Sequence, residues 1–355
     1  MQEIRTIPHA IFDYNRIILY DEFINRQSKG TPNTSSLSNF FCNRTKGILS
    51  NASKKKIRKI IQLWMNAIEC KAIVSRKSKD WIKSQINFTT LTLPASQFHT
   101  DKEIKRDMLN RYLIEIKRKN KNNSYLWVAE KQKNSNIHFH ILSEKYTDWK
   151  LIRCIWNSIL DDFGYIEKYR DNQREFHKKG FQLRTDKLEF WSEKQQRDAY
   201  DYGIRTNWSD PNSTDIHSLK KIKNIGAYIT KYLTKGFNLI VEEELKKKIN
   251  KDTTPEQIDL IRKDIAYEWK SILSVDGRLW GCSDNLKELV KSDFIISSVV
   301  DEYIQILLND KSKKIINGDN YLIICDTSLI ELKNKSPGLF LSFCEYQNKN
   351  YQLIY

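Results

Sequence analysis

The chain has 355 residues, of which 40% are hydrophobic and 12% aromatic, so it can bury a sizeable core and is expected to form about two domains. Its formal net charge of +16 favours a polyanionic partner, with nucleic acid as the leading class. Six scattered cysteines without a C-x-x-C pair argue against a zinc ribbon or a disulfide framework and fit a reducing cytoplasm. No apolar run approaches the roughly 18 residues of a membrane helix. No phosphate-binding loop for a nucleotide cofactor is present, so neither a membrane protein nor an ATPase is expected.

Residues 1–80 are expected to form a basic N-terminal extension. The polar, turn-forming residues 26–39 predict a loop. After Ser53 as the predicted N-cap, apolar residues recur at helical spacing from Ile57 to Ile68 and indicate an amphipathic helix. The first turns of this helix carry a cluster of positive charge that is a candidate contact for DNA phosphates, with a solvated outer face as the alternative. The cluster consists of Lys54, Lys55, Lys56, Arg58 and Lys59.

Residues 81–240 alternate between strand and helix patterns. Strands are predicted at 88–94, 125–130, 137–143 and 214–217, and helices at 104–116, 149–163 and 219–235, the last ending at Gly236. A capping box at Thr100-Asp-Lys-Glu103 opens the first of these helices. The order β-α-β-β-α-β predicts an α+β fold with a largely antiparallel sheet of split β-α-β, ferredoxin-like or RRM-like topology, with helices on one face.

The strand at 137–143 carries a candidate metal site. His138 and His140 are two residues apart, so both imidazoles lie on one face of the strand. Glu130 ends the preceding strand and is a candidate third ligand for a divalent ion. A symmetric turn at 131–136 puts Glu130 on the opposite face, whereas a bulge or a one-residue offset brings it opposite His138, and the sequence leaves this register open. An ordinary pair of half-buried strand histidines is the alternative.

The helix predicted at 219–235 carries two tyrosines one turn apart. Tyr228 and Tyr232 are four residues apart and share a face, so either hydroxyl could be offered to the same phosphate. Lys231 and Lys235 each follow a tyrosine by three residues and are candidates for balancing phosphate charge. Considered without the histidines, this pattern is typical of an amphipathic helix with buried or interfacial tyrosines.

Two polar residues precede this helix. Asp215 and His217 share a face of the strand at 214–217 and are candidates for supporting the site by hydrogen bonds, with a structural histidine as the alternative. Residues 241–355 are expected to be mainly helical, with a capping box at Thr254-Pro-Glu-Gln257, and to end in short strands such as 321–325. No chemistry is apparent in this last region.

Three motifs in this order resemble those of rolling-circle replication initiators of the His-hydrophobe-His (HUH) endonuclease superfamily. They are the strand at 88–94, Glu130 with His138-Phe-His140, and the pair Tyr228-x-x-Lys and Tyr232-x-x-Lys. The resemblance covers residues 85–236, and the double tyrosine is most similar to initiators of small single-stranded DNA phages. It therefore implies an HUH nuclease topology for the domain at 81–240.

The resemblance also implies a mechanism. Glu130, His138 and His140 would hold Mn²⁺ or Mg²⁺, although such ligands also accept zinc, cobalt or nickel. One tyrosine would nick single-stranded DNA at a replication origin and keep the 5′-phosphate, leaving a 3′-hydroxyl for a host polymerase, with a host helicase as a further partner. The second tyrosine would end the round without ATP, because the phosphotyrosine keeps the bond energy. The lysines would assist at the phosphate, and the expected location is the cytoplasm of a bacterial host.

Three other functions remain open on the sequence alone. Transposases and mobilisation relaxases share the metal cluster and the tyrosine chemistry. A non-catalytic nucleic-acid-binding protein would use the sheet and the basic helices without forming a covalent product. A metal-dependent phosphatase or water-using nuclease would leave the paired tyrosines without a role.

Overall fold

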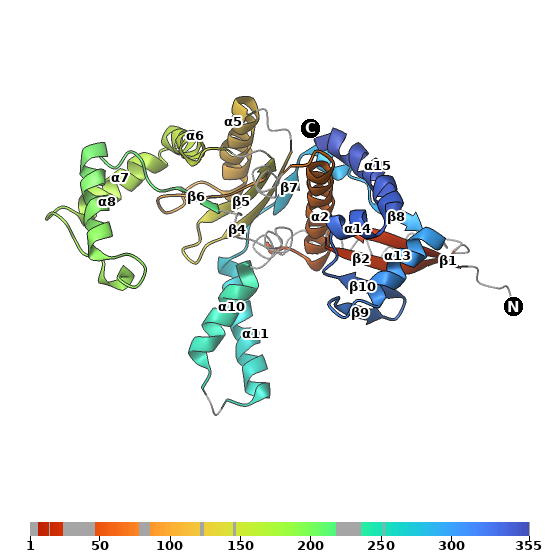
Figure 1. The fold of residues 1–355 in the computed structure, drawn as a ribbon. Coiled ribbons are helices and arrows are strands. Elements are labelled where there is room, and N and C mark those ends of the chain that lie inside the picture. Colours follow the sequence, from red (N-terminus) through yellow and green to blue (C-terminus); the bar gives the residue numbers. More distant parts are fainter. Residues whose placement is uncertain are drawn as a thin grey trace, which may run out of the picture.

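The computed structural model describes residues 6–13, 15–23, 47–77, 86–120, 124–144, 147–217, 236–250 and 253–354. Its strands are β1 (Thr6–Asp13), β2 (Arg16–Phe23), β3 (Ile86–Leu91), β4 (Tyr125–Lys131), β5 (Ile137–Glu144), β6 (Thr214–His217), β7 (Trp280–Cys282), β8 (Ser292–Ile295), β9 (Ile315–Gly318) and β10 (Tyr321–Cys325). They form two five-stranded antiparallel sheets, which confirms the predicted α+β class (Figure 1).

The helices lie around and between these sheets (Figure 1). The longer ones are α2 (Asn51–Val74), α5 (Asn110–Asn120), α6 (Trp149–Asp162), α7 (Tyr165–Phe176), α8 (Glu193–Thr206), α10 (Gly236–Lys248), α11 (Pro255–Ile272), α13 (Ser298–Leu308) and α15 (Pro337–Ile354). The shorter ones are α4 (Asp101–Glu103), a π-helix (Ile104–Leu109), a 3-10 turn (Thr185–Lys187), α12 (Asp284–Lys287) and α14 (Leu329–Lys335). No helix in the described ranges is long and apolar enough to cross a membrane.

The first sheet has the strand order β6-β3-β5-β4-β7. Four of its strands are the ones predicted between residues 88 and 217, whereas β7 was not predicted. The strand expected at 88–94 ends at Leu91, three residues before Pro94. The capping box at Thr100 is confirmed, because the Thr100 side chain accepts a hydrogen bond from the backbone of Glu103, whose carboxylate accepts from the Thr100 backbone. The helix that it opens runs through α4 and the π-helix into α5.

Helices cover both faces of this sheet, so the expectation of helices on one face is wrong. Alternate strand residues such as Trp127 and Phe139 pack against α5 and α6. The residues between them, including Val128 and Leu142, pack instead against the apolar stripe of α2. The N-cap of α2 is Ser50 rather than Ser53, because Ser50 has extended backbone angles and its side chain accepts a hydrogen bond from the Ser53 backbone.

The second sheet, in the order β8-β1-β2-β10-β9, joins segments from both ends of the sequence. β1 pairs with β8, and β2 pairs with β10. One face packs on α13, α14 and α15. One expectation for the C-terminal region is corrected here. Helices α14 and α15 follow β10, so the described chain ends in helix and not in short strands. Helix α10 begins at Gly236, and the helix predicted at 219–235, which Gly236 was expected to end, lies outside the described residues. The capping box at Thr254 is confirmed.

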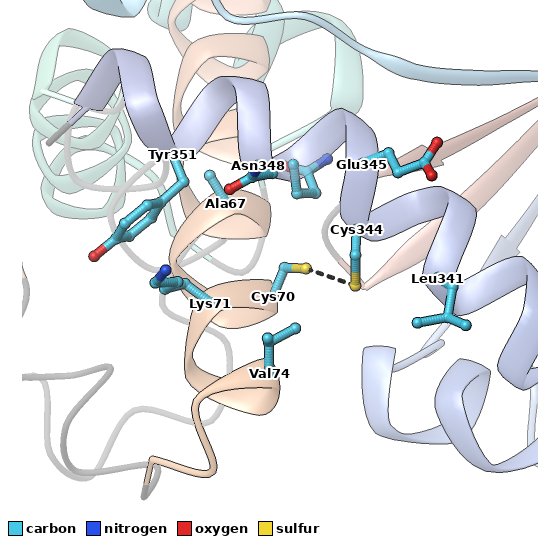
Figure 2. Close-up of a pocket in the computed structure, with 10 residues that line it drawn as sticks. Ala67, Cys70, Lys71, Val74, Leu341, Cys344, Glu345, Asn348 and Tyr351 are labelled. Atoms are coloured by element: carbon cyan, nitrogen blue, oxygen red, sulfur yellow. Dashed lines mark hydrogen bonds between the residues drawn. The ribbon is translucent and has the colours of Figure 1, made fainter.

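Helices α2 and α15 pack side by side and enclose a cavity of about 450 Å³ (Figure 2). Within it, the Cys70 and Cys344 sulfurs are 3.2 Å apart, joined by a hydrogen bond between free thiols. The Lys71 ammonium lies 4.6 Å from the centre of the Tyr351 ring. Helix α2 connects the two sheets. It packs on the first sheet along its length, and near its end it packs on α15, which covers the second sheet.

Two pairs of helices extend away from the sheets. α7 and α8 are inserted between α6 and β6 and project to the left in Figure 1, and the sequence patterns did not predict them. α10 and α11 project in another direction and share a small apolar core that includes Val241, Leu245 and Ile265.

Candidate metal centre

Glu130 faces His138 directly across the β4–β5 pair. β4 extends to Lys131, which pairs with Ile137, and five residues remain for the turn. Within that turn the Gln132 backbone amide donates to the Asn136 carbonyl at 2.8 Å, and Ser135 has a φ of 65°. This one-residue offset places Glu130 on the same face as both histidines, which resolves the register that the sequence left open.

The three side chains converge on one point. The Nε2 atoms of His138 and His140 lie 3.6 Å and 3.7 Å from the same Glu130 oxygen, and the two imidazole centres are 4.7 Å apart. All three side chains are largely shielded, with 12–17% of their surface exposed. Among the residues described, this is the one group of three or more potential ligands close enough to hold a metal ion.

The charge states of this cluster suit a cation. Burial alone would raise the pKa of Glu130, but the two adjacent histidines outweigh burial and hold this pKa at about 2. Burial lowers the pKa of His138, against the opposing influence of Glu130. Near pH 7 the carboxylate is therefore ionised and the His138 imidazole neutral, which are the protonation states of metal ligands.

The ring nitrogens of His138, unpaired within the described structure, are the strongest indication that this cluster binds a ligand. Both of its ring nitrogens are buried, and neither has a hydrogen-bond partner among the described residues. A buried polar atom without a partner costs about 1–3 kcal/mol, so such atoms are rare outside functional sites. Two imidazoles and one carboxylate form a donor set that binds divalent metal ions and leaves positions for other oxygen ligands. The residues present therefore fit a divalent cation.

Neighbours on β3 hold the His140 ring in place. The Thr90 hydroxyl lies 3.0 Å from His140 Nδ1, and Thr90 and His140 are partners in the strand register. When this hydroxyl accepts the Nδ1 proton, Nε2 carries a lone pair that can bind a cation held beside Glu130. Phe88 stacks on the imidazole with ring centres 5.8 Å apart and an angle of 9°. Strand propensity alone accounts for a threonine at position 90, so no pattern in the sequence pointed to this contact.

The proposed nucleophiles lie outside the residues that the structure describes. This holds for Tyr228, Lys231, Tyr232 and Lys235, and for the side chain of His217. Asp215 is exposed on β6 and pairs in the register with Thr90, one strand away from His140. Its predicted support of the site stays a prediction.

The basic first turns of α2 lie on the same face of the sheet as the metal cluster. The Lys56 ammonium is 5.8 Å from the centre of the Trp280 ring, and Trp280 pairs with Val128, two residues before Glu130. Lys55, Arg58 and Lys59 are exposed, and no ion pair involves them within the described ranges. The sequence predicted this charge cluster, but its place on the face that bears the histidines depends on the packing of α2 against the sheet, which the sequence did not predict.

Residues 86–237 match a family model described as Replication-associated protein ORF2. The matched region begins at β3 and includes the metal cluster, the projecting helices α7 and α8, and the segment with both tyrosines. No curated protein and no solved structure matches the chain.

Proposed function

We propose that this chain initiates rolling-circle replication by nicking and joining DNA, because residues 86–237 match the ORF2 family of replication-associated proteins. Glu130, His138 and His140 bind the metal ion, and Tyr228 and Tyr232 are the nucleophiles. The observation that carries the proposal is the strand register that sets Glu130 opposite His138 and leaves the buried nitrogens of His138 without another partner among the described residues.

The metal ligands prepare the site for a phosphate. A divalent cation held there would supply positive charge to a non-bridging phosphate oxygen, and oxygen-rich substrates favour Mn²⁺ or Mg²⁺. Glu130 contributes negative charge without first losing a proton, because its pKa is already about 2. Thr90 keeps the His140 ring from rotating, and Phe88 prevents it from tilting.

The nicking step exchanges one phosphodiester for another. The phenol oxygen of Tyr228 or Tyr232 attacks the phosphorus and loses its proton, while the 3′-oxygen leaves and gains one. The products are a 5′-phosphotyrosine and a free 3′-hydroxyl. An unperturbed phenol has a pKa of about 10, so the attack depends on in-line positioning and on nearby positive charge, for which Lys231 and Lys235 are our candidates.

The second tyrosine accounts for joining. After one round it attacks the regenerated origin junction, and the new 3′-hydroxyl then attacks the first phosphotyrosine, releasing that tyrosine and closing the displaced strand. The number of phosphodiester bonds is conserved in each exchange, so no nucleotide cofactor is required. The 3′-hydroxyl freed by the first nick is the primer for a host polymerase, and a host helicase is the expected source of strand separation.

The arrangement of elements supports a division of roles. The order β6-β3-β5-β4 with helices α5 and α6 on one face is consistent with the proposed split β-α-β topology of an HUH nuclease domain. We assign origin DNA to the basic turns of α2, which face the same side as the metal cluster. The second sheet, built from both ends of the sequence, forms the accessory part. The proposed location is the cytoplasm of the host cell.

A covalent-trapping experiment tests this function. Purified protein is incubated with Mn²⁺ or Mg²⁺ and labelled single-stranded DNA from the surrounding genome, and protein–DNA adducts are resolved on a denaturing gel. We expect a metal-dependent adduct that is lost in the Tyr228→Phe/Tyr232→Phe double variant, with the single variants showing which tyrosine nicks first. Tyr267→Phe is the control, because Tyr267 on α11 is 84% exposed and remote in the sequence. Cleavage that persists in the double variant would instead identify a water-using nuclease.

A further inference from the structure

The inserted helices α7 and α8, with the residues that connect them, form a projecting arm (residues 165–208) that the metal site does not use (Figure 1). Its base is fixed to the nuclease sheet. The Arg153 guanidinium of α6 lies 3.1 Å from the Asp210 carboxylate, and the Asn157 amide donates to the same carboxylate at 2.7 Å. The chain then enters β6, the neighbour of β3. The arm is therefore attached at the edge of the sheet that carries the metal ligands.

A cavity of about 390 Å³ lies between the two helices of the arm. Aromatic side chains line much of it, including Phe176, His177, Phe181, Tyr200 and Trp208. Two helices that served only to pack on each other would be expected to close such a space, because protein interiors contain few voids larger than a water molecule. A volume of this size falls in the range of small-ligand sites, roughly 300–1,000 Å³.

The rings offer flat surfaces at similar orientations. The His177 ring lies within 15° of parallel to Phe181 and within 9° of parallel to Trp208, with centres 6.4 Å and 6.2 Å away. Trp208 is held firmly, because its indole occupies the space next to Gly203 where any side chain would collide with it. Aromatic faces held in this way are platforms on which bases stack.

Polar groups in the wall add hydrogen-bonding capacity. His177 Nδ1 accepts from the Gln182 backbone at 3.3 Å, and burial lowers the pKa of His177, so the neutral ring carries its proton on Nε2. Gln196 anchors the connecting segment through bonds to the Arg184 and Trp191 backbone. The Arg184 side chain lies 5.9 Å from the Phe176 ring and supplies a cation at the wall.

We propose that this cavity binds an unpaired nucleobase of single-stranded DNA, stacked on the aromatic rings, while the adjoining phosphates contact the lysines of the arm. Lys179, Lys187 and Lys194 are exposed, and none forms an ion pair within the part of the chain described, so their charge is available to a polyanion. The inference rests on the proposed function for its substrate class and adds a second point of contact, set apart from the metal ligands.

Photo-crosslinking tests the site without requiring catalysis. Full-length protein in EDTA, which prevents metal-dependent nicking, is mixed with single-stranded oligonucleotides that carry 5-iodouracil, irradiated, and digested for mass spectrometry. We expect crosslinked peptides from residues 176–208, containing Phe181, Tyr200 or Trp208. Oligonucleotide that binds and crosslinks only outside the arm overturns the inference.

Substitutions give an independent measurement. Tyr200→Leu removes a ring while keeping apolar volume, and Arg184→Gln removes a cation at the wall, from a side chain whose ion pair with Asp186 is exposed. Stacking on one base is typically equivalent to about tenfold in affinity, so Tyr200→Leu should weaken oligonucleotide binding by about that factor in fluorescence anisotropy, and Arg184→Gln by a smaller one. Phe190→Ala is the matched control, since Phe190 is an aromatic of the same arm that is 83% exposed and does not line the cavity. Circular dichroism confirms that each variant is folded.

The two proposals can fail separately. A normal tyrosine adduct together with unchanged binding by the Tyr200 and Arg184 variants refutes the nucleobase site alone. Crosslinks in the arm without any tyrosine adduct refute the nicking mechanism alone.

Discussion

Thr90 on β3 and His140 on β5 are opposite each other in the strand register, and their side chains meet at 3.0 Å. The hydroxyl holds the orientation of one predicted metal ligand, and when it accepts the Nδ1 proton the Nε2 lone pair is left for a cation. The neighbouring Thr89 points to the other face, where its hydroxyl is buried without a partner in the described structure. The two adjacent threonines thus point to opposite faces of the same sheet, and only Thr90 contacts a metal ligand. Substituting each in turn gives a matched pair of variants.

Thr90→Val should weaken Mn²⁺ binding by about 10–100-fold, the usual effect of removing the hydrogen-bond partner of a metal-binding histidine. Isothermal titration calorimetry measures this directly. Thr89→Val is the control, and it should leave metal affinity unchanged while raising the free energy of unfolding by about 1 kcal/mol, because it removes an unsatisfied buried hydroxyl. Equal metal affinities for the two variants would contradict the assigned role of Thr90.

Glu130→Gln should abolish measurable Mn²⁺ binding and the tyrosine adduct together. The substitution keeps the size of the side chain but removes the charge that balances the cation, so its effect should exceed the roughly 10–100-fold loss typical of an outer hydrogen-bond partner. Glu115→Gln on the surface of α5 is the control for loss of one carboxylate. An adduct that forms at the normal rate in the Glu130 variant would show that the metal is bound elsewhere.

Asp101 and Lys131 form a buried ion pair of 2.7 Å that joins the start of α4 to the end of β4, next to Glu130. Burial would raise the pKa of Asp101, but hydrogen bonds from Lys131, Gln97 and the Asp276 backbone lower it below the ordinary value. A carboxylate with a lowered folded pKa stabilises the fold above its unfolded pKa of about 3.9, and this stability is lost as the pH falls below that value.

Asp101→Asn should therefore lower the free energy of unfolding at pH 7 by about 3 kcal/mol, since the buried Lys131 charge loses its carboxylate and keeps the Gln97 amide oxygen as an uncharged acceptor. Between pH 5 and pH 3 the variant should lose less stability than the unsubstituted protein. Urea unfolding at several pH values measures both effects, with the exposed Asp161→Asn as control. Parallel stability curves for the Asp101 variant and the unsubstituted protein would rule out this ion pair as a source of acid sensitivity.

The basic turns of α2 should contribute to DNA affinity through phosphate contacts. Replacing Lys55, Arg58 and Lys59 by Gln should lower the affinity for single-stranded DNA. The slope of log K against log salt should shrink by about 2, because each lost phosphate contact contributes about 0.7. The control removes three exposed charges elsewhere, at Lys263, Lys270 and Lys311. If both triple variants reduce the slope equally, binding reflects net charge alone and α2 has no particular role.

The local parts of the fold were predictable from sequence. The strands at β4, β5 and β6 and the capping boxes at Thr100 and Thr254 depend on patterns within a few residues, and the structure has them close to where they were predicted. The convergence of His138 and His140 follows from strand alternation alone. The position of Glu130 did not follow, because it depends on a five-residue turn in which Ser135 has a positive φ.

The long-range parts were not predictable. His9 pairs with Ile295, and no local pattern indicates which distant strand a given strand will join. The packing of α2 on the face that bears the metal ligands was missed for the same reason. Helices α7 and α8 have few apolar positions and buried residues, so the periodicity that reveals a helix was weak there. The positions of Tyr228 and Tyr232 stay predictions.

Because β2 pairs with β10, the second sheet can be completed only after most of the chain has been translated. β1 and β2 are translated first, whereas β10 follows about 300 residues later, a wait of roughly 15–60 s at the usual 5–20 residues per second. During that time β1 and β2 can pair with each other but not with β8 and β10, and unpaired strand edges invite aggregation. β7 is also translated late, so the sheet with the metal ligands cannot close before most of the polypeptide has left the ribosome. The five-stranded sheet that carries Glu130, His138 and His140 is thus complete only late in synthesis, long after these three residues have been translated.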